Sequence, residues 1–261
     1  MRVVVCVKQV PLVTSISIDP ERGTLNREGV PSVLNPFCEY ALEQALRVRE
    51  EKGGEVVVIS MGPPQARQAL LRCMELGADR GYLLSDRAFA GSDVWATAGT
   101  LKEAVERLVP GYGLILTGQQ AMDGDTAQVP GELAEMLDLP QVGRALEVHP
   151  LDEEVRVIRE AEDRVETVRS TLPCLVSVSK GGTRRFPSMR DLIGAREREI
   201  VTVQAKDLGI PPEEAGLEGS RTRVIKVFPP PQRGPGRTVK CEDPWKAARE
   251  IIDLLDLEGD R

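Results

Sequence analysis

Continuous apolar runs alternate with amphipathic segments along the N-terminal two-thirds of the chain. Runs such as RVVVCVK at 2–8 and EVVVIS at 55–60 show no regular exchange of apolar and polar positions. A strand that is covered on both faces has this pattern, whereas a strand with one solvated face alternates. The pattern predicts buried strands at 2–8, 55–60, 81–85, 113–118 and 174–179.

Helical patterns separate these strands. Before the first one, Asn35 can cap the opening turn and Pro36 suits the first helical position. Helices are expected near 36–52, 64–76, 93–108 and 127–138. Strands and helices in alternation imply right-handed crossovers between parallel strands. The predicted fold class is therefore α/β, a three-layer α/β/α arrangement with a mainly parallel sheet.

The pattern changes from about Val142. Apolar and charged residues then alternate between polar turns, which predicts an antiparallel hairpin at the sheet edge, at about 145–172. After Ile200 the chain is rich in Pro and Gly, which predicts an extended arm without a core of its own over 201–261. The arm ends in an amphipathic helix within EDPWKAAREIIDLLDLEG. The arm either attaches to a partner chain, or it is a flexible tail or a helix that folds back on its own domain, and the sequence favours neither interpretation.

Composition narrows the class of protein. The chain has 261 residues, 41% hydrophobic and 29% charged, with a formal net charge of -7. An acidic chain of this kind is not expected to bind nucleic acid generally. No apolar run approaches the roughly 18 residues of a membrane span, and the chain starts directly with a predicted strand. These features predict a cytoplasmic protein that is not embedded in a membrane.

Few residues are suited to bond-making catalysis. The single histidine, His149, excludes a multi-histidine metal site, and a Ser-His-Asp or Cys-His mechanism would have to use it. No metal ligand and no catalytic residue is assigned. No P-loop motif is present. The cysteines form no C-x-x-C pair and indicate reduced core residues, with a lone thiol nucleophile as the open alternative. They are Cys6, Cys38, Cys73, Cys174 and Cys241.

The most polar loop follows a predicted buried strand. It reads GQQAMDGDTAQVP, spans residues 118–130 and is called the polar loop below. Ligands of open parallel sheets bind outside the carboxyl ends of the strands, where segments 6–11, 35–38 and 60–64 also lie. Thr126 or Asp125 could cap the next helix and leave backbone amides free for a phosphate. Asp123 and Asp125 would repel that phosphate, so they are helix caps, backbone anchors, ribose partners or parts of an ordinary turn.

A basic cluster lies further along, in SKGGTRRFPSMR. Its cations are Lys180, Arg184, Arg185 and Arg190. In an acidic chain such a cluster is either a solvated loop or a surface that docks on an acidic partner.

Several segments together resemble one family, the β subunits of electron transfer flavoproteins and their nitrogen-fixation relatives. The matching stretches run in family order and cover nearly the whole chain. They are CVKQVP, NPFCEYALEQALRVRE, MGPPQ, GADRGYLL, TGQQAMDGDTAQVPGELAEMLDLPQ and LPCLVSVSKGGTRRFPSMRDLIGA.

The resemblance implies an adenine nucleotide α-hydrolase-like fold and a heterodimer whose α subunit holds a redox-active FAD. The β subunit would hold a second nucleotide, which is AMP in ordinary members and a second FAD in electron-bifurcating members. Residues 1–200 would then form the nucleotide-binding domain, and residues 201–261 an arm and helix that contact the α subunit. The implied nucleotide contacts are Cys6, Asn35, Pro36, Phe37, Cys38, Met61, Gly118, Gln119, Gln120, Ala121, Met122, Asp123, Gly124, Asp125, Thr126, Ala127, Gln128 and Val129.

The same resemblance implies an electron relay. Electrons would come from acyl-CoA dehydrogenases or similar flavin dehydrogenases and pass to a membrane quinone oxidoreductase. Residues 184–193, the docking segment, correspond to the family's recognition loop. Its implied contact residues are Arg184, Arg185, Met189, Arg190, Leu192 and Ile193.

Two rival functions belong to related folds. An adenylating or pyrophosphatase enzyme typically carries a Ser-Gly-Gly-x-Asp-Ser loop after its first strand, and CVKQVP has no such glycine pair. A freestanding adenine-nucleotide sensor of the universal-stress type is usually shorter and lacks the hairpin, the docking segment and the arm.

Overall fold

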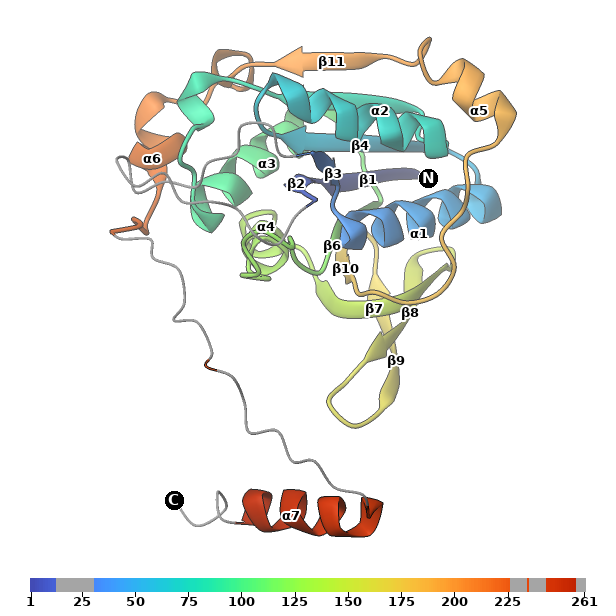
Figure 1. The fold of residues 1–261 in the computed structure, drawn as a ribbon. Coiled ribbons are helices and arrows are strands. Elements are labelled where there is room, and N and C mark those ends of the chain that lie inside the picture. The colour runs from blue at the N-terminus through green and yellow to red at the C-terminus, as the bar shows by residue number, and fades with distance from the viewer. Residues whose placement is uncertain (13–30, 226–233, 235–242, 257–261) are drawn as a thin grey trace.

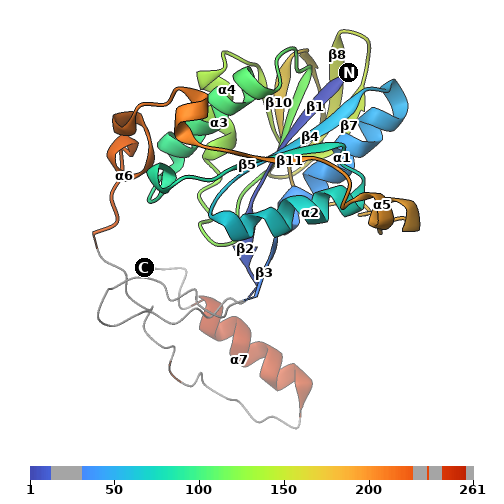
Figure 2. The ribbon, with the colours of Figure 1, turned by 90° about the horizontal axis from the view of Figure 1, so that it is seen from above.

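A large twisted sheet lies between two layers of helices (Figures 1 and 2). The computed structural model describes residues 1–12, 31–225, 234 and 243–256. In this part of the chain the sheet has nine strands, in the order β11-β5-β4-β1-β6-β10-β7-β8-β9. Pairing is parallel from β11 to β7 and antiparallel from β7 to β9. The predicted three-layer α/β/α fold is confirmed.

The strands of the large sheet are, in chain order, β1 (Arg2–Val7), β4 (Glu55–Met61), β5 (Arg80–Leu84), β6 (Leu114–Gly118), β7 (Gln141–Pro150), β8 (Glu154–Glu160), β9 (Val165–Thr171), β10 (Cys174–Val178) and β11 (Ile200–Val203). A separate antiparallel pair consists of β2 (Gln9–Pro11) and β3 (Ser32–Leu34). The helices are α1 (Pro36–Lys52), α2 (Arg67–Leu76), α3 (Val94–Leu108), α4 (Val129–Met136), α5 (Met189–Gly194), α6 (Gly216–Gly219) and α7 (Pro244–Asp256). Short 3-10 turns are η1 (Pro64–Ala66), η2 (Arg87–Phe89), η3 (Ala205–Leu208) and η4 (Pro212–Glu214).

Both faces of the central strands are buried, as their continuous apolar runs predict. On one face, Val3 and Val5 of β1 share a core with Leu42 of α1. On the other face, Val4 of β1 shares a second core with Leu133 of α4. Because side chains alternate along a strand, a single run of valines serves both layers.

The predicted edge hairpin is present as the antiparallel strands β7, β8 and β9. At the opposite edge, the sheet continues beyond residue 200 through β11, which pairs with β5. Val203, Leu208 and Ala215 are then buried in the core. The extended arm that is expected from residue 201 therefore begins later in the chain. The sequence does not indicate this, because the apolar residues stand too far apart, between Pro and Gly, to give a helix or strand periodicity.

The predicted C-terminal helix is present as α7, which lies apart from the sheet in both views (Figures 1 and 2). Trp245, Ile251 and Ile252 of α7 are exposed. The segments 226–233, 235–242 and 257–261 of the expected arm lie outside the described residues. No helix of the described residues is long and apolar enough to cross a membrane.

Candidate functional site

The order of strands reverses between β1 and β6. From β1 the chain proceeds through α1 to β4 on one side, whereas α3 carries it from β5 to β6 on the other. In an open parallel sheet the two connections diverge at such a point and leave a crevice at the carboxyl ends of the strands. Val7 and Gly118 end these two strands, and the region outside their carboxyl ends, where a ligand is expected, is called the crevice below.

Asn35 joins the start of α1 to the polar loop across this crevice. Its side-chain amide donates a hydrogen bond to the carbonyl of Gln120 at 2.8 Å, and its oxygen accepts from the backbone N–H of Met122 at 3.4 Å. Asn35 is only 1% exposed. Asn35 stands at the N-cap position of α1, as predicted, but its side chain forms no capping hydrogen bond. A buried amide needs partners for its oxygen and its nitrogen, and the loop supplies both.

Gly118 lets β6 approach α1 closely. A Cβ atom built at Gly118 would lie 2.8 Å from the Cβ of Phe37 and 3.0 Å from the backbone nitrogen of Cys38. Real Cβ atoms do not approach that closely, so a larger residue would push the loop away from α1. The glycine thus brings Phe37, Cys38 and the polar loop into one contact.

The polar loop is also held by charge and by unusual backbone geometry. Lys8, which follows β1, forms a 2.8 Å ion pair with Asp123. Gln120 donates a hydrogen bond to the Asp125 carboxylate. Asp125 and Ala127 both have φ of 54°, the left-handed region that alanine rarely adopts. Non-glycine residues in this conformation need support from their surroundings and cluster at functional sites.

The expected cap of the following helix is absent. α4 begins at Val129, and Gln128 precedes it without a side-chain cap. The prediction that Thr126 or Asp125 fills this role is wrong, because the left-handed residues carry the chain through two more positions before the helix begins. Residues 122–128 are exposed.

Three buried polar atoms of this region have no hydrogen-bond partner in the described residues. They are Ser60 Oγ at the end of β4, Thr117 Oγ1 at the end of β6 and Gln119 Oε1 in the polar loop. Buried polar groups in folded proteins are normally bonded to protein, water or ligand. Sequence reasoning missed Ser60 and Thr117, because they lie within apolar strand patterns.

The remaining predicted contacts line the same end of the sheet. Cys6 pairs across the sheet with Thr117, and Met61 is the last residue of β4. Burial, together with the nearby Cys38, raises the pKa of the Cys6 thiol to about 12. Burial likewise raises the pKa of Cys38, against hydrogen bonds that lower it. Both thiols stay protonated at neutral pH, so neither is activated as a nucleophile.

The other cysteines fit the same interpretation. Cys73 and Cys174 are buried and unpaired, and burial raises the pKa of each thiol. Cys241 lies outside the described residues. In the described part of the chain, no group of three or more His, Cys, Asp or Glu side chains is arranged to hold a metal ion.

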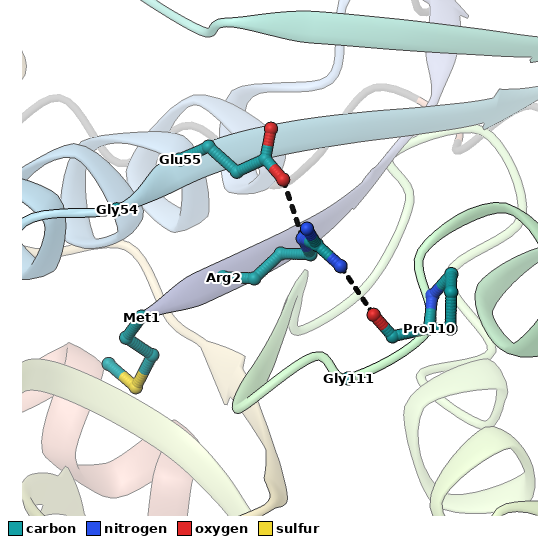
Figure 3. A pocket seen from close by; sticks show the side chains of 6 residues that line it. All are labelled: Met1, Arg2, Gly54, Glu55, Pro110 and Gly111. Atoms are coloured by element: carbon teal, nitrogen blue, oxygen red, sulfur yellow. Dashed lines mark hydrogen bonds and ion pairs between the residues drawn. The ribbon is translucent and has the colours of Figure 1, made fainter.

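A hollow at the amino ends of β1 and β4 lies at the opposite end of the sheet from the polar loop (Figure 3). It is lined by Met1, Arg2, Gly54, Glu55, Pro110 and Gly111. The Arg2 guanidinium donates to Glu55 at 2.5 Å and to the carbonyl of Pro110. The hollow is the weaker candidate for a ligand site, because its charged side chains pair with each other. It also lies at the amino ends of β1 and β4, whereas open parallel sheets bind ligands at the carboxyl ends.

The docking segment lies outside the crevice. Arg184 is paired with Glu39 of α1, and Arg185 is paired with Glu43 and Glu50. Lys180 lies over the ring of Phe37, 4.7 Å from its centroid. Much of the basic cluster is therefore satisfied within the chain. The exposed side chains of the segment include Arg190, Met189, Leu192 and Ile193.

Comparison with known proteins assigns the family. A sequence profile described as the electron transfer flavoprotein domain matches residues 22–208. A subunit of Acetobacterium woodii named caffeyl-CoA reductase-Etf complex subunit CarD is 44% identical over 98% of both chains. The electron transfer flavoprotein subunit beta of Thermoanaerobacterium thermosaccharolyticum is 44% identical over 88% of both chains. Protein FixA of Sinorhizobium fredii is 40% identical over 98% of this chain and 92% of its own. The chain therefore belongs to the family of electron transfer flavoprotein β subunits, which includes the FixA proteins.

Proposed function

We propose that this chain is the β subunit of a heterodimeric electron transfer flavoprotein. It binds AMP or a second FAD in the crevice between β1 and β6 and frames the FAD held by an α subunit. The complex works in the cytoplasm, takes electrons from acyl-CoA dehydrogenases or similar flavin dehydrogenases, and passes them to a membrane quinone oxidoreductase. Family membership supports the electron-transfer role, and the contact between Asn35 and the polar loop supports the nucleotide.

The observation that carries the nucleotide proposal is the contact of Asn35 with the polar loop. This contact draws together segments that lie far apart in the sequence, at the place where open parallel sheets bind ligands. Within the polar loop, the Gln119 side-chain oxygen has no hydrogen-bond partner among the described residues and would be available to a ribose or a base if the side chain turned outward.

Charge at the mouth of the crevice suits the anionic part of a nucleotide. Lys8 and Lys180 bring positive charge near Asn35 and Phe37, and Asp123 balances Lys8. Each lysine would attract a phosphate that binds near it, and the pairing with Lys8 offsets the charge of Asp123. Asp123 therefore acts as an anchor of the loop through Lys8.

The flavin of the partner subunit supplies the one-electron chemistry when it is bound. The residues of this chain bind the nucleotide, help to orient the flavin and exclude water from it. Phe37 is buried between Gly118 and Lys180, so its position is fixed. In the proposed complex it forms part of the wall around the flavin of the α subunit. Neither the single histidine nor the buried thiols are needed for a proton transfer or a covalent step.

The choice of dehydrogenase is supported by one relative. The Acetobacterium woodii protein is named as a subunit of a caffeyl-CoA reductase-Etf complex. That name places the relative in a complex with an enzyme that acts on a CoA thioester, which is also the substrate class of the acyl-CoA dehydrogenases that we propose as partners of this chain.

Co-expression with the α subunit tests the proposal. The purified complex is denatured, and the released nucleotides are identified and counted by mass spectrometry. One FAD with one AMP indicates a simple relay, and two FAD indicate a second flavin in this chain. A colourless homo-oligomer that takes up no α subunit contradicts the proposal and favours a nucleotide sensor.

A further inference from the structure

The docking segment is fastened to α1 where it begins. Arg184 pairs with Glu39, and its guanidinium lies 5.2 Å from the centroid of the Tyr40 ring. Just before it, the carbonyl of Thr183 accepts a hydrogen bond from Arg47 at 3.5 Å. One face of α1 therefore receives consecutive residues of the segment.

The strongest of these contacts joins Arg185 to Glu43. One Glu43 oxygen accepts from Arg185 Nε at 2.8 Å and from the Arg185 backbone N–H at 3.2 Å. The other oxygen accepts from Arg47 at 2.8 Å. The Glu43 side chain is only 6% exposed, whereas Glu50, which also pairs with Arg185, is 53% exposed. Glu43 is thus a buried carboxylate whose two oxygens are both paired.

The far end of the segment is fastened to α2. Arg198 donates to Asp191 of α5 at 2.6 Å and to the carbonyl of Met74 in α2. Ala195, at the end of α5, is buried against the core. Ser188 caps α5 by accepting from the backbone N–H of Asp191 at 3.0 Å.

Exposed apolar side chains lie between the two attachments. Phe186 is 91% exposed, Met189 is 72% exposed and Ile193 is 70% exposed. A short segment that carries such side chains is expected to collapse or to move unless its ends are held. Here ion pairs hold both ends, so the apolar side chains are presented to solvent in one arrangement.

We propose that Glu43 is a positioning residue for docking: through Arg185 it holds the docking segment on α1, so that Phe186, Met189 and Ile193 form a preformed apolar surface for a flavin dehydrogenase. This inference rests on the proposed function, in which that dehydrogenase is the electron donor. Glu43 acts through Arg185 and through Arg47, which donates to the Thr183 carbonyl at the start of the segment.

The burial of Glu43 explains why its ion pair with Arg185, and not that of the exposed Glu50, holds the docking segment in place. Exposed ion pairs contribute little because water and salt screen them. Removing one member of a buried pair leaves the other charge without its partner. Glu43→Gln keeps the shape of the side chain but removes the negative charge that pairs with Arg185 and Arg47. The segment then has to be ordered when the dehydrogenase binds, and that ordering weakens binding.

The test uses the complete αβ complex and a butyryl-CoA dehydrogenase supplied with butyryl-CoA. In Glu43→Gln we expect the KM for the complex to rise about tenfold, while kcat at saturation stays within about twofold. Hydrogen–deuterium exchange of residues 183–194 should become faster. Glu50→Gln should give a smaller rise in KM, and Glu51→Gln, which removes an exposed charge from the same helix, should give none.

Arg185 provides a second variant in case Glu43→Gln fails to fold. Arg185→Met should reproduce the rise in KM, and Arg185→Lys, which keeps the charge, should partly restore the wild-type value. The inference is overturned if KM and the exchange of residues 183–194 are unchanged in a Glu43 variant that assembles with full flavin content. If the wild-type complex is not reduced at all, the proposed function fails, and the exchange data alone decide whether Glu43 holds the segment.

Discussion

The side-chain amide of Asn35 donates a 2.8 Å hydrogen bond to the carbonyl of Gln120, which lies 85 positions further along the chain. This bond fixes the polar loop against the start of α1. The proposed nucleotide site therefore depends on one buried side chain that contacts the loop on two backbone groups.

Asn35→Ala should weaken nucleotide retention. The substitution leaves two backbone groups of the loop without their partner, which costs about 1–3 kcal/mol in the free energy of unfolding. The complex should lose AMP or FAD from this chain during gel filtration and melt at a lower temperature. Nucleotide content and Tm are the measurements.

Gln44→Ala is the matched control for that variant. Gln44 is also buried, and it contacts two backbone groups of β7, at Val148 and Leu146. Its loss should lower Tm by a similar amount but leave nucleotide content unchanged. Equal nucleotide loss in both variants would mean that Asn35 acts only through general stability.

Gly118→Ala should disturb the same contact from the other side. The added methyl would lie 2.8 Å from the Phe37 Cβ, so the loop or α1 must move, at a cost of about 1–3 kcal/mol. Gly124→Ala in the same loop meets no atom within 4 Å and should be close to neutral. Urea unfolding of both variants checks this, and a Gly118→Ala protein as stable as wild type would show that the approach is not tight.

Asp123→Ala should reduce nucleotide retention with little effect on stability. The Lys8 side chain is 47% exposed, so the ion pair itself contributes less than about 1 kcal/mol. If Asp123 anchors the loop through Lys8, then Lys8→Ala and the double variant should show the same loss, without addition. Asp152→Ala, which breaks the exposed pair with Lys52 elsewhere, is the control. Unchanged nucleotide content in Asp123→Ala would make this residue part of an ordinary turn.

Met189→Glu should slow reduction by the dehydrogenase and leave flavin absorbance unchanged. Met189 is exposed on α5, so a charge there alters only the surface that the partner meets. Val165→Glu, at an exposed apolar position on β9, should leave the rate as it is. Stopped-flow reduction at several dehydrogenase concentrations measures both, and a loss of bound flavin in Met189→Glu would contradict a role limited to docking.

The Glu43–Arg185 pair should make part of the stability depend on pH. Burial opposes ionisation of Glu43, but hydrogen bonds from Arg185 and Arg47 leave its pKa below the ordinary value of 4.5. The folded state therefore holds the proton less tightly than the unfolded state does. The stabilisation is complete above about pH 4.5 and is lost as the pH falls through the lowered pKa.

Thermal unfolding of wild type and Glu43→Gln between pH 7 and pH 3.5 checks this sign. The difference in Tm between the two proteins should shrink as the pH falls below 4.5. A difference that stays constant would show that Glu43 has the same pKa in both states.

The sequence predicts the layers of the fold well and its polar details less well. Val3 to Val7 form an unbroken apolar run because both faces of β1 are buried, and this signal is local. Asn35 looks like a helix cap because it precedes Pro36, yet its partner is 85 positions away. Tertiary hydrogen bonds of this kind leave no mark in a local pattern.

The edge of the domain shows the same limit. β11 is a four-residue strand that gains its place by pairing with β5, so its own periodicity is too short to detect. Arg185 looks like a free cation of a basic cluster, but the acidic side chains that pair with it lie on α1. Ser60 and Thr117 look like incidental polar residues in strands, and only their buried, unpartnered oxygens single them out.

Photolabelling of the nucleotide-stripped complex with 8-azido-AMP is the most direct test of the proposed nucleotide site. Labelled residues are assigned by peptide fragmentation, with AMP as the competitor. We expect competed label within 6–11, 35–38 or 118–129 of this chain. Competed label at Glu55 and Pro110, in the hollow at the opposite end of the sheet, or no competed label in this chain, would contradict the proposal.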